Sequence, residues 1–243
     1  MIKLMNILKE VESKILVPRR TPEERQKNYL LSIQKKIQQY IKDGSKGDLL
    51  LRDMPITSLP DNLKVGGDLD LTHTKINSLP KNLKVGGSLI LYGTPITSLH
   101  DNLKVGGSLI LYGTPITSLP DNLEVGGNLE LNGLKITSLP DNIKIYGGIQ
   151  LPDTEITSLP DNFEVGGSLN LYNTKITSLP DNLKVGRSLN LHKTKITSLP
   201  NNLKVNGYLR LSRTPLSKKY TKEEIKKMIN DKGGYVKEEI FTS

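Results

Sequence analysis

The sequence repeats itself every twenty residues between Gly47 and Pro215. Two stretches are nearly identical: SLILYGTPITSLHDNLKVGG begins at Ser88 and SLILYGTPITSLPDNLEVGG begins at Ser108. A unit this short cannot bury an apolar face alone, so such units stack and share one continuous core. We therefore expect a solenoid of eight full units and a ninth that is cut short after Leu216.

Each unit opens with the alternating pattern x-L-x-L-x, as at Leu109 and Leu111. A period of two predicts a strand with one buried face, and so short a strand must pair with its neighbours, here in a parallel sheet. The pattern runs from Leu49 and Leu51 to Leu209 and Leu211, with Ile149 as its one substitution. The interior would be completed by the isoleucine of each unit and by the leucine and valine of its second half, as at Leu123 and Val125.

The second half of each unit carries turn signals and no helical pattern. Leu119 to Asn122 reads Leu-Pro-Asp-Asn, in which proline fixes φ and Asp and Asn favour a bend. Too few residues remain for a helix, so we expect irregular, helix-poor return segments. The Gly-Gly pairs before the strands, such as 106–107, predict either positive φ or close approach of neighbouring backbones.

These units resemble the leucine-rich-repeat family, and specifically its short bacterial subtype of about twenty residues that carries L-x-x-L-P. The resemblance covers residues 48–216, and the G-G-x-L-x-L variant is similar to repeat proteins of bacteria and their large phages. It implies an α/β repeat solenoid, a rod with a parallel sheet on one face. The family asparagine is threonine here, and we interpret this column as structural, with hydroxyls bonding the adjacent backbone. It comprises Thr74, Thr94, Thr114, Thr154, Thr174, Thr194 and Thr214, and Met54 and Leu134 interrupt it.

Residues 1–47 are predicted to form a helical N-terminal cap. Thr21-Pro22-Glu23-Glu24 is a capping box with proline at the first helical position, and apolar residues then follow at helical spacing until Gly44. This predicts a helix over 22–42, and a shorter amphipathic pattern predicts another over 2–14.

Residues 217–243 are predicted to form a C-terminal cap with one short helix. Thr221-Lys222-Glu223-Glu224 is again a capping pattern and predicts a helix to about Asn230. Caps of this kind would cover core and strand edges that a solenoid otherwise exposes at its ends.

The net charge of +9 lies mostly at the ends of the chain. Residues 1–47 carry eleven Lys and Arg against five Asp and Glu, whereas 48–215 carry sixteen against fifteen. One interpretation is a basic helical face for nucleic-acid phosphates, and the other is an ordinary solvated helix surface with little aromatic interleaving. The basic residues in question are Arg19, Arg20, Arg25, Lys27, Lys35 and Lys36.

The residues between and after the leucines should form columns on the exposed side of the sheet. Ile90, Tyr92, Ile110 and Tyr112 would then lie together on two adjacent strands, as in the centre of a protein interface, with acidic residues beside them and basic residues toward the C-terminal end. The alternative is that two recently duplicated units share residues that strands favour. The predicted partner-binding residues are Asp70, Ile90, Tyr92, Ile110, Tyr112, Glu130, Asn170, Tyr172, Asn190, His192 and Arg210.

The sequence offers little for catalysis or metal binding. It has no cysteine, which removes thiol chemistry and sets it apart from effectors of the same repeat subtype that append a ubiquitin ligase with a catalytic cysteine. His73 and His192 lie six units apart, and His100 replaces the proline of a turn. The column Asp101, Asp121, Asp141, Asp161 and Asp181 could hold Ca²⁺, but such residues more often bond turn backbone. We expect no catalytic residue, metal or cofactor.

The sequence therefore favours a non-enzymatic scaffold that binds a protein through its strand face. We expect a cytoplasmic protein, because residues 1–17 lack a signal-peptide pattern and no segment reaches the ~20 apolar residues of a membrane span. The resemblance of the repeat implies a bacterial or phage protein that acts on a host factor. The alternatives are nucleic-acid binding through the N-terminal helices and a structural or virion component. The identity of the partner does not follow from the sequence.

Overall fold

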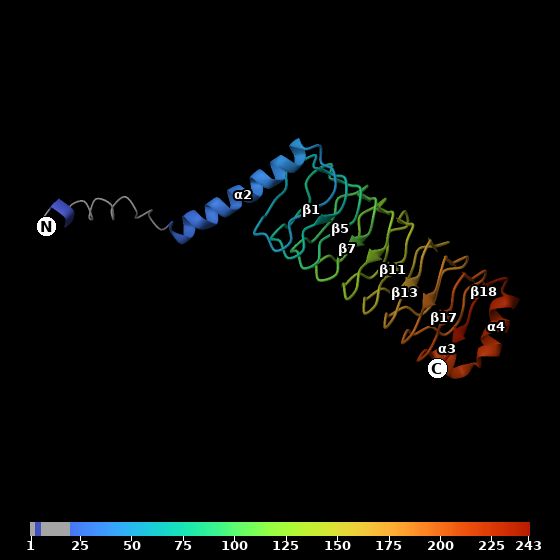
Figure 1. Ribbon diagram of the computed structural model, residues 1–243. Helices are drawn as coiled ribbons and strands as arrows, with labels where there is room; N and C mark the ends of the chain where they lie inside the picture. The colour runs from blue at the N-terminus through green and yellow to red at the C-terminus, as the bar shows by residue number, and fades with distance from the viewer. Residues whose placement is uncertain (1–2, 6–19) are drawn as a thin grey trace. The chain divides into compact units, whose positions relative to one another are not determined.

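The computed structural model describes residues 3–5 and 20–243 (Figure 1). The chain separates into two compact units, residues 1–39 and residues 40–243. Most of the helix predicted over 2–14 lies outside the described residues. None of the described helices is long and apolar enough to cross a membrane.

Helix α2 (Pro22–Lys42) confirms the helix predicted over 22–42. The Thr21 hydroxyl accepts a hydrogen bond from the Glu24 amide at 3.1 Å, and the Glu24 carboxylate accepts one from the Thr21 amide at 2.9 Å. These two bonds satisfy amides that the first helical turn leaves unpaired. The helix ends before Gly44, which takes a φ of 85°.

A ten-stranded parallel sheet runs the length of the solenoid, as Figure 1 shows. Its register is fixed by the repeat, because each strand pairs with the one twenty residues later, for example Leu49 with Leu69. The strands are β1 (Leu49–Leu50), β3 (Leu69–Asp70), β5 (Leu89–Ile90), β7 (Leu109–Ile110), β9 (Leu129–Glu130), β11 (Ile149–Gln150), β13 (Leu169–Asn170), β15 (Leu189–Asn190), β17 (Leu209–Arg210) and β19 (Ile240–Phe241).

The return segments are helix-poor, as expected, but each also contains a two-residue strand. These strands pair in parallel as a five-stranded sheet from β2 to β10 and a four-stranded sheet from β12 to β18. In the return strands from β2 to β16 the valine or isoleucine is buried, while the lysine or glutamate before it is exposed or half-buried; in β18, Val236 is half-buried and follows Tyr235. The strands are β2 (Lys64–Val65), β4 (Lys84–Val85), β6 (Lys104–Val105), β8 (Glu124–Val125), β10 (Lys144–Ile145), β12 (Glu164–Val165), β14 (Lys184–Val185), β16 (Lys204–Val205) and β18 (Tyr235–Val236).

The core consists of aliphatic ladders with a threonine column at their edge. Leu109, Leu111 and Ile116, with their equivalents, are buried, and the most exposed of them, Ile56, exposes 7% of its surface. Each of the seven threonine hydroxyls donates to the carbonyl of the leucine three residues earlier, at 2.7–2.9 Å. The threonines are therefore structural, and each closes a turn within its own unit rather than bridging to the next.

The Gly-Gly pairs allow close packing of neighbouring units. A β-carbon on Gly106 would lie 2.1 Å from the carbonyl oxygen of Gly86. Among the described residues, the glycines with positive φ are elsewhere, so close approach accounts for these pairs. Tyr146 and Asn206 occupy the Gly106 position in two other units, so this constraint is local.

The C-terminal segment contains helices α3 (Pro215–Lys219) and α4 (Lys222–Asp231), followed by β18 and β19. The predicted helix after Thr221 is confirmed, with its capping box formed by Thr221 and Glu224. Ile225 and Ile229 on α4 are buried. The sequence pattern does not predict the two strands that follow: β18 is the last strand of the four-stranded sheet, and β19 is the last strand of the ten-stranded sheet.

Candidate functional site

The outer side of the ten-stranded sheet brings two isoleucines and two tyrosines together. Ile90 on β5 pairs with Ile110 on β7, and both side chains are half-buried. The Tyr92 and Tyr112 rings pack with centroids 4.4 Å apart at an interplanar angle of 36°. We call these four residues the apolar patch. Their adjacency follows directly from the twenty-residue register.

A third ring extends this stack toward the N-terminal end of the sheet. The His73 ring lies 4.9 Å from the Tyr92 ring, and its Nδ1 lies 3.1 Å from the Asp53 carboxylate. The stack rests on glycine backbone, because a β-carbon on Gly93 would approach the His73 ring to 2.5 Å. Gly93 lies at a turn position with positive φ. Two other units also have glycine there, and the rest place Asp, His, Asn, Lys or Arg.

Asp70, beside the apolar patch, is engaged within the fold rather than exposed. It keeps only 5% of its surface accessible. Arg52 bonds its carboxylate through Nη2 at 2.9 Å, and the Thr72 amide donates to it at 2.9 Å. Burial alone would raise the pKa of Asp70, but the bonds from Thr72 and Arg52 outweigh it and hold the pKa below its ordinary value. The accessible group at this edge is Arg52.

On the other side of the apolar patch, the same column becomes polar. Glu130 on β9 is half-buried and pairs in register with Ile110 and Gln150. Beyond it, the side-chain amide of Asn170 donates to the side-chain oxygen of Gln150 at 2.9 Å, and the side-chain amide of Asn190 donates to that of Asn170 at 3.0 Å. These amides bond one another, so Asn170 and Asn190 contribute to sheet stability as well as to the surface.

A second aromatic cluster lies toward the C-terminal end and is basic. The Tyr172 and His192 rings stack at 5.4 Å with an interplanar angle of 11°. Lys193 Nζ donates to the Tyr172 hydroxyl at 2.9 Å and lies 5.1 Å from its ring centroid. Burial and then the charges of Arg210, Arg213 and Lys193 lower the pKa of His192. We call Tyr172, His192, Lys193, Arg210 and Arg213 the basic patch.

The predicted nucleic-acid residues do not form one stripe on α2. Arg25 and Lys36 fall on one side at ~100° per residue, while Lys27 and Lys35 fall on others. All four side chains are exposed, as is that of Arg20 before the helix. Arg19 lies outside the described residues.

Two carboxylates of the aspartate column bond the next turn. Asp101 accepts from the Asp121 amide at 3.2 Å, and Asp181 accepts from the Asn201 amide at 2.8 Å. The backbone bond from Asn201 lowers the pKa of Asp181. In the ranges that the structure describes, no three His, Asp or Glu side chains are grouped to hold a metal ion.

No protein-family model matches the chain, and no curated protein matches it either. The structure shows a β-solenoid of twenty-residue units in parallel sheets, with an apolar patch and a basic patch on one sheet face.

Proposed function

We propose that this chain is a non-enzymatic interaction module of the leucine-rich-repeat type that binds a protein partner through the outer face of the ten-stranded sheet. The apolar patch is the centre of the interface, and Glu130, Arg52 and the basic patch form its polar surroundings. We further propose that the protein is cytoplasmic and of bacterial or phage origin, because its repeat resembles those of bacterial and phage proteins.

The observation that carries this proposal is the contrast between the two sides of the same strands. Inward positions hold leucine in every unit except at Ile149, whereas the outward position between the leucines ranges from Ile90 through Glu130 to Arg210. Core packing explains the constant positions but makes no demand on the outward ones. A varied sheet face on a constant scaffold supports recognition.

The apolar patch also has suitable chemistry for an interface centre. Tyrosines supply large contact area with few rotatable bonds and a hydroxyl that can still bond a partner. The Tyr92 and Tyr112 rings already pack against each other, so binding a partner would cost little side-chain conformational entropy. We infer a partner that presents apolar side chains to the patch.

The test is a pull-down from lysate of the source cell with wild-type protein and the double variant Tyr92→Ala/Tyr112→Ala. Tyr146→Ala is the matched control, because Tyr146 is 61% exposed and follows β10 in a return segment. Captures are made at low salt and at about 0.5 M salt, with nuclease treatment in parallel. We expect a protein that survives salt and nuclease, is lost with the double variant and is retained by the control.

Other outcomes would contradict this proposal. Recovery of nucleic acid that disappears at high salt would place the activity on the basic residues of α2, because phosphate contacts weaken steeply with ionic strength. A partner retained by the double variant, with circular dichroism showing an intact fold, would remove the apolar patch from the interface. Assembly of the chain with itself or with particle proteins would favour the structural alternative.

A further inference from the structure

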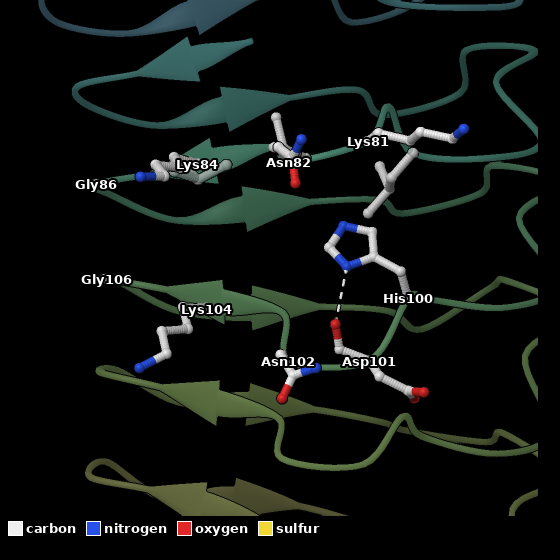
Figure 2. Close-up of a pocket in the computed structure, with 12 residues that line it drawn as sticks. Lys81, Asn82, Lys84, Gly86, His100, Asp101, Asn102, Lys104 and Gly106 are labelled. Carbon is white, nitrogen blue, oxygen red and sulfur yellow. Dashed lines mark hydrogen bonds between the residues drawn. The ribbon is translucent and has the colours of Figure 1, made fainter. Parts of the chain in front are cut away.

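A groove of about 840 Å³ opens on the return side of the solenoid, between the segments that carry β4 and β6 (Figure 2). Lys81, Lys84, His100 and Lys104 are among the residues that line it. It involves neither the apolar patch nor the basic patch, so it is independent of the proposed function.

Two departures from the repeat meet at this groove. Lys81 occupies a column that otherwise holds Asp or Asn, and His100 occupies a column that otherwise holds Pro. Six of the eight units keep Asp at the first position, and seven keep Pro at the second. In two adjacent turns, an aspartate is thus replaced by a lysine and a proline by a histidine. These replacements change the local charge, and packing of the core does not require them.

The groove also coincides with a gap in the five-stranded sheet of the return segments. Strand β4 pairs with β6 only through Val85 and Val105, whereas β2 pairs with β4 at two positions. Asn62 bonds Asn82, and Asn102 bonds Asn122. In the described part of the chain no such bond joins Asn82 to Asn102 across the groove. Figure 2 shows the His100 ring between these two return segments.

His100 leaves one ring nitrogen without a partner. Its Nδ1 lies 3.3 Å from the carbonyl oxygen of Asp101, which can only accept, so Nδ1 carries the proton in this contact (Figure 2). Nε2 is buried and makes no hydrogen bond within the described residues. A proline at this position would leave no unpaired nitrogen atom buried, so the stability of the fold alone does not explain the histidine.

The groove has a positive charge excess. Lys81 and Lys84 have no carboxylate within ion-pair distance among the residues the structure describes. Lys104 lies 2.9 Å from Glu124, and this bond raises the pKa of Lys104, which keeps it charged. Asp101 is the one acidic residue among those that line the groove. Figure 2 shows the Lys84 and Lys104 side chains extending toward one end of the groove and the Lys81 side chain toward the other. Ammonium groups at these ends attract phosphate oxygens.

We propose that this groove binds a small phosphorylated molecule, with Lys84 as its contact at one end, Lys81 as its contact at the other and His100 as the wall that holds the two segments apart. A nucleic-acid strand fits less well, because the outward lysine row along the return strands is interrupted. Glu124 follows Lys104 and bonds it, and Glu164 bonds Lys184 at 3.0 Å. The unpaired lysines of this row therefore do not form a continuous strip.

The test is titration calorimetry of the full chain with inorganic phosphate and with pyrophosphate at fixed ionic strength. Lys81→Asp and His100→Pro restore the residues of other units, so both variants should fold, which circular dichroism checks. Lys195→Asp is the matched control, since it makes the same charge change at an exposed lysine that does not line the groove. We expect saturable binding of one anion by wild type, weakened at least tenfold in Lys81→Asp and Lys84→Gln, weakened also in His100→Pro, which removes the wall, and unchanged in Lys195→Asp.

Three results would overturn the proposal. Wild-type protein that shows no saturable binding has no phosphate site. Equal weakening in Lys195→Asp means that net charge, not the groove, governs binding. A single-stranded oligonucleotide that binds more tightly than pyrophosphate, and loses affinity evenly with every lysine substitution, identifies a nucleic-acid surface instead.

Discussion

The Tyr92 ring lies against the backbone of Gly113, where a β-carbon would come within 3.0 Å of the ring. Gly113 has a φ of 76°, in the left-handed region that glycine and, less readily, asparagine adopt. In another unit Asn173 takes the same turn position with a φ of 54°. The conformation therefore tolerates asparagine, and the close contact at 113 comes from the neighbouring Tyr92 ring.

The first prediction compares two glycines at the same turn position. Gly113→Asn should lower the free energy of unfolding by roughly 1 kcal/mol relative to Gly133→Asn, because the Tyr92 ring must move aside. Gly133 serves as the control, because a β-carbon added there would meet no atom within 4 Å. Urea denaturation followed by circular dichroism measures both. Equal stabilities would mean that the ring contact imposes no constraint.

The second prediction concerns acid stability and Asp70. Its pKa is held below the ordinary value of 3.8, so its ionised form stabilises the fold above the unfolded pKa, and this contribution is lost as pH falls through the folded pKa. Asp70→Asn should therefore cost about 1–3 kcal/mol at pH 7 and progressively less below pH ~4. Urea titrations of both proteins at pH 7, 4 and 2.5 measure the difference. A difference that stays constant with pH would contradict the assignment to the Asp70 charge.

Much of this architecture is predictable because each unit repeats a strong local signal. The x-L-x-L alternation defines the buried face, and the twenty-residue spacing then fixes which residues are neighbours, including Ile90 and Ile110. The capping boxes at Thr21 and Thr221 locate two helix starts, because each combines a hydroxyl with a glutamate three residues later.

The remaining features depend on contacts that the pattern does not contain. Strands of two residues, such as Lys64–Val65, are too short to show a period. The repeat therefore does not predict the sheets of the return segments. Strands β18 and β19 lack the leucine pattern and join the sheets only because α4 replaces a return segment. The His100 groove had a signal, a single histidine in a proline column, but its meaning depended on Lys81 in the preceding turn.

The third prediction concerns the threonine column. Thr154 is 3% exposed, and its hydroxyl donates to the Leu151 carbonyl at 2.8 Å. Thr154→Val keeps the shape but removes the donor, so the free energy of unfolding should fall by about 1 kcal/mol. Thr177→Val is the control, because Thr177 is exposed and the substitution makes the same exchange of a hydroxyl for a methyl group. Thermal denaturation that shifts equally for the two variants would show that the hydroxyl bond contributes nothing specific.

The fourth prediction tests whether the last strand is part of the fold. Ile240 on β19 pairs with Leu209 and is 4% exposed, whereas the adjacent Phe241 is 41% exposed and meets Tyr208 edge-on at 5.7 Å. Ile240→Ala should lower the free energy of unfolding by about 2–4 kcal/mol, as expected for a cavity in the core.

Phe241→Ala is the matched control and should cost no more than about 1.5 kcal/mol, the scale of an aromatic pair. Hydrogen exchange locates the effect, because the Leu211 amide donates to the Phe241 carbonyl at 2.7 Å. That amide should lose protection in Ile240→Ala more than in Phe241→Ala, since loss of the buried side chain releases the strand. If truncation of Ile240 leaves both stability and exchange unchanged, β19 adds backbone pairing to the sheet but no core, and the solenoid is closed by α4 alone.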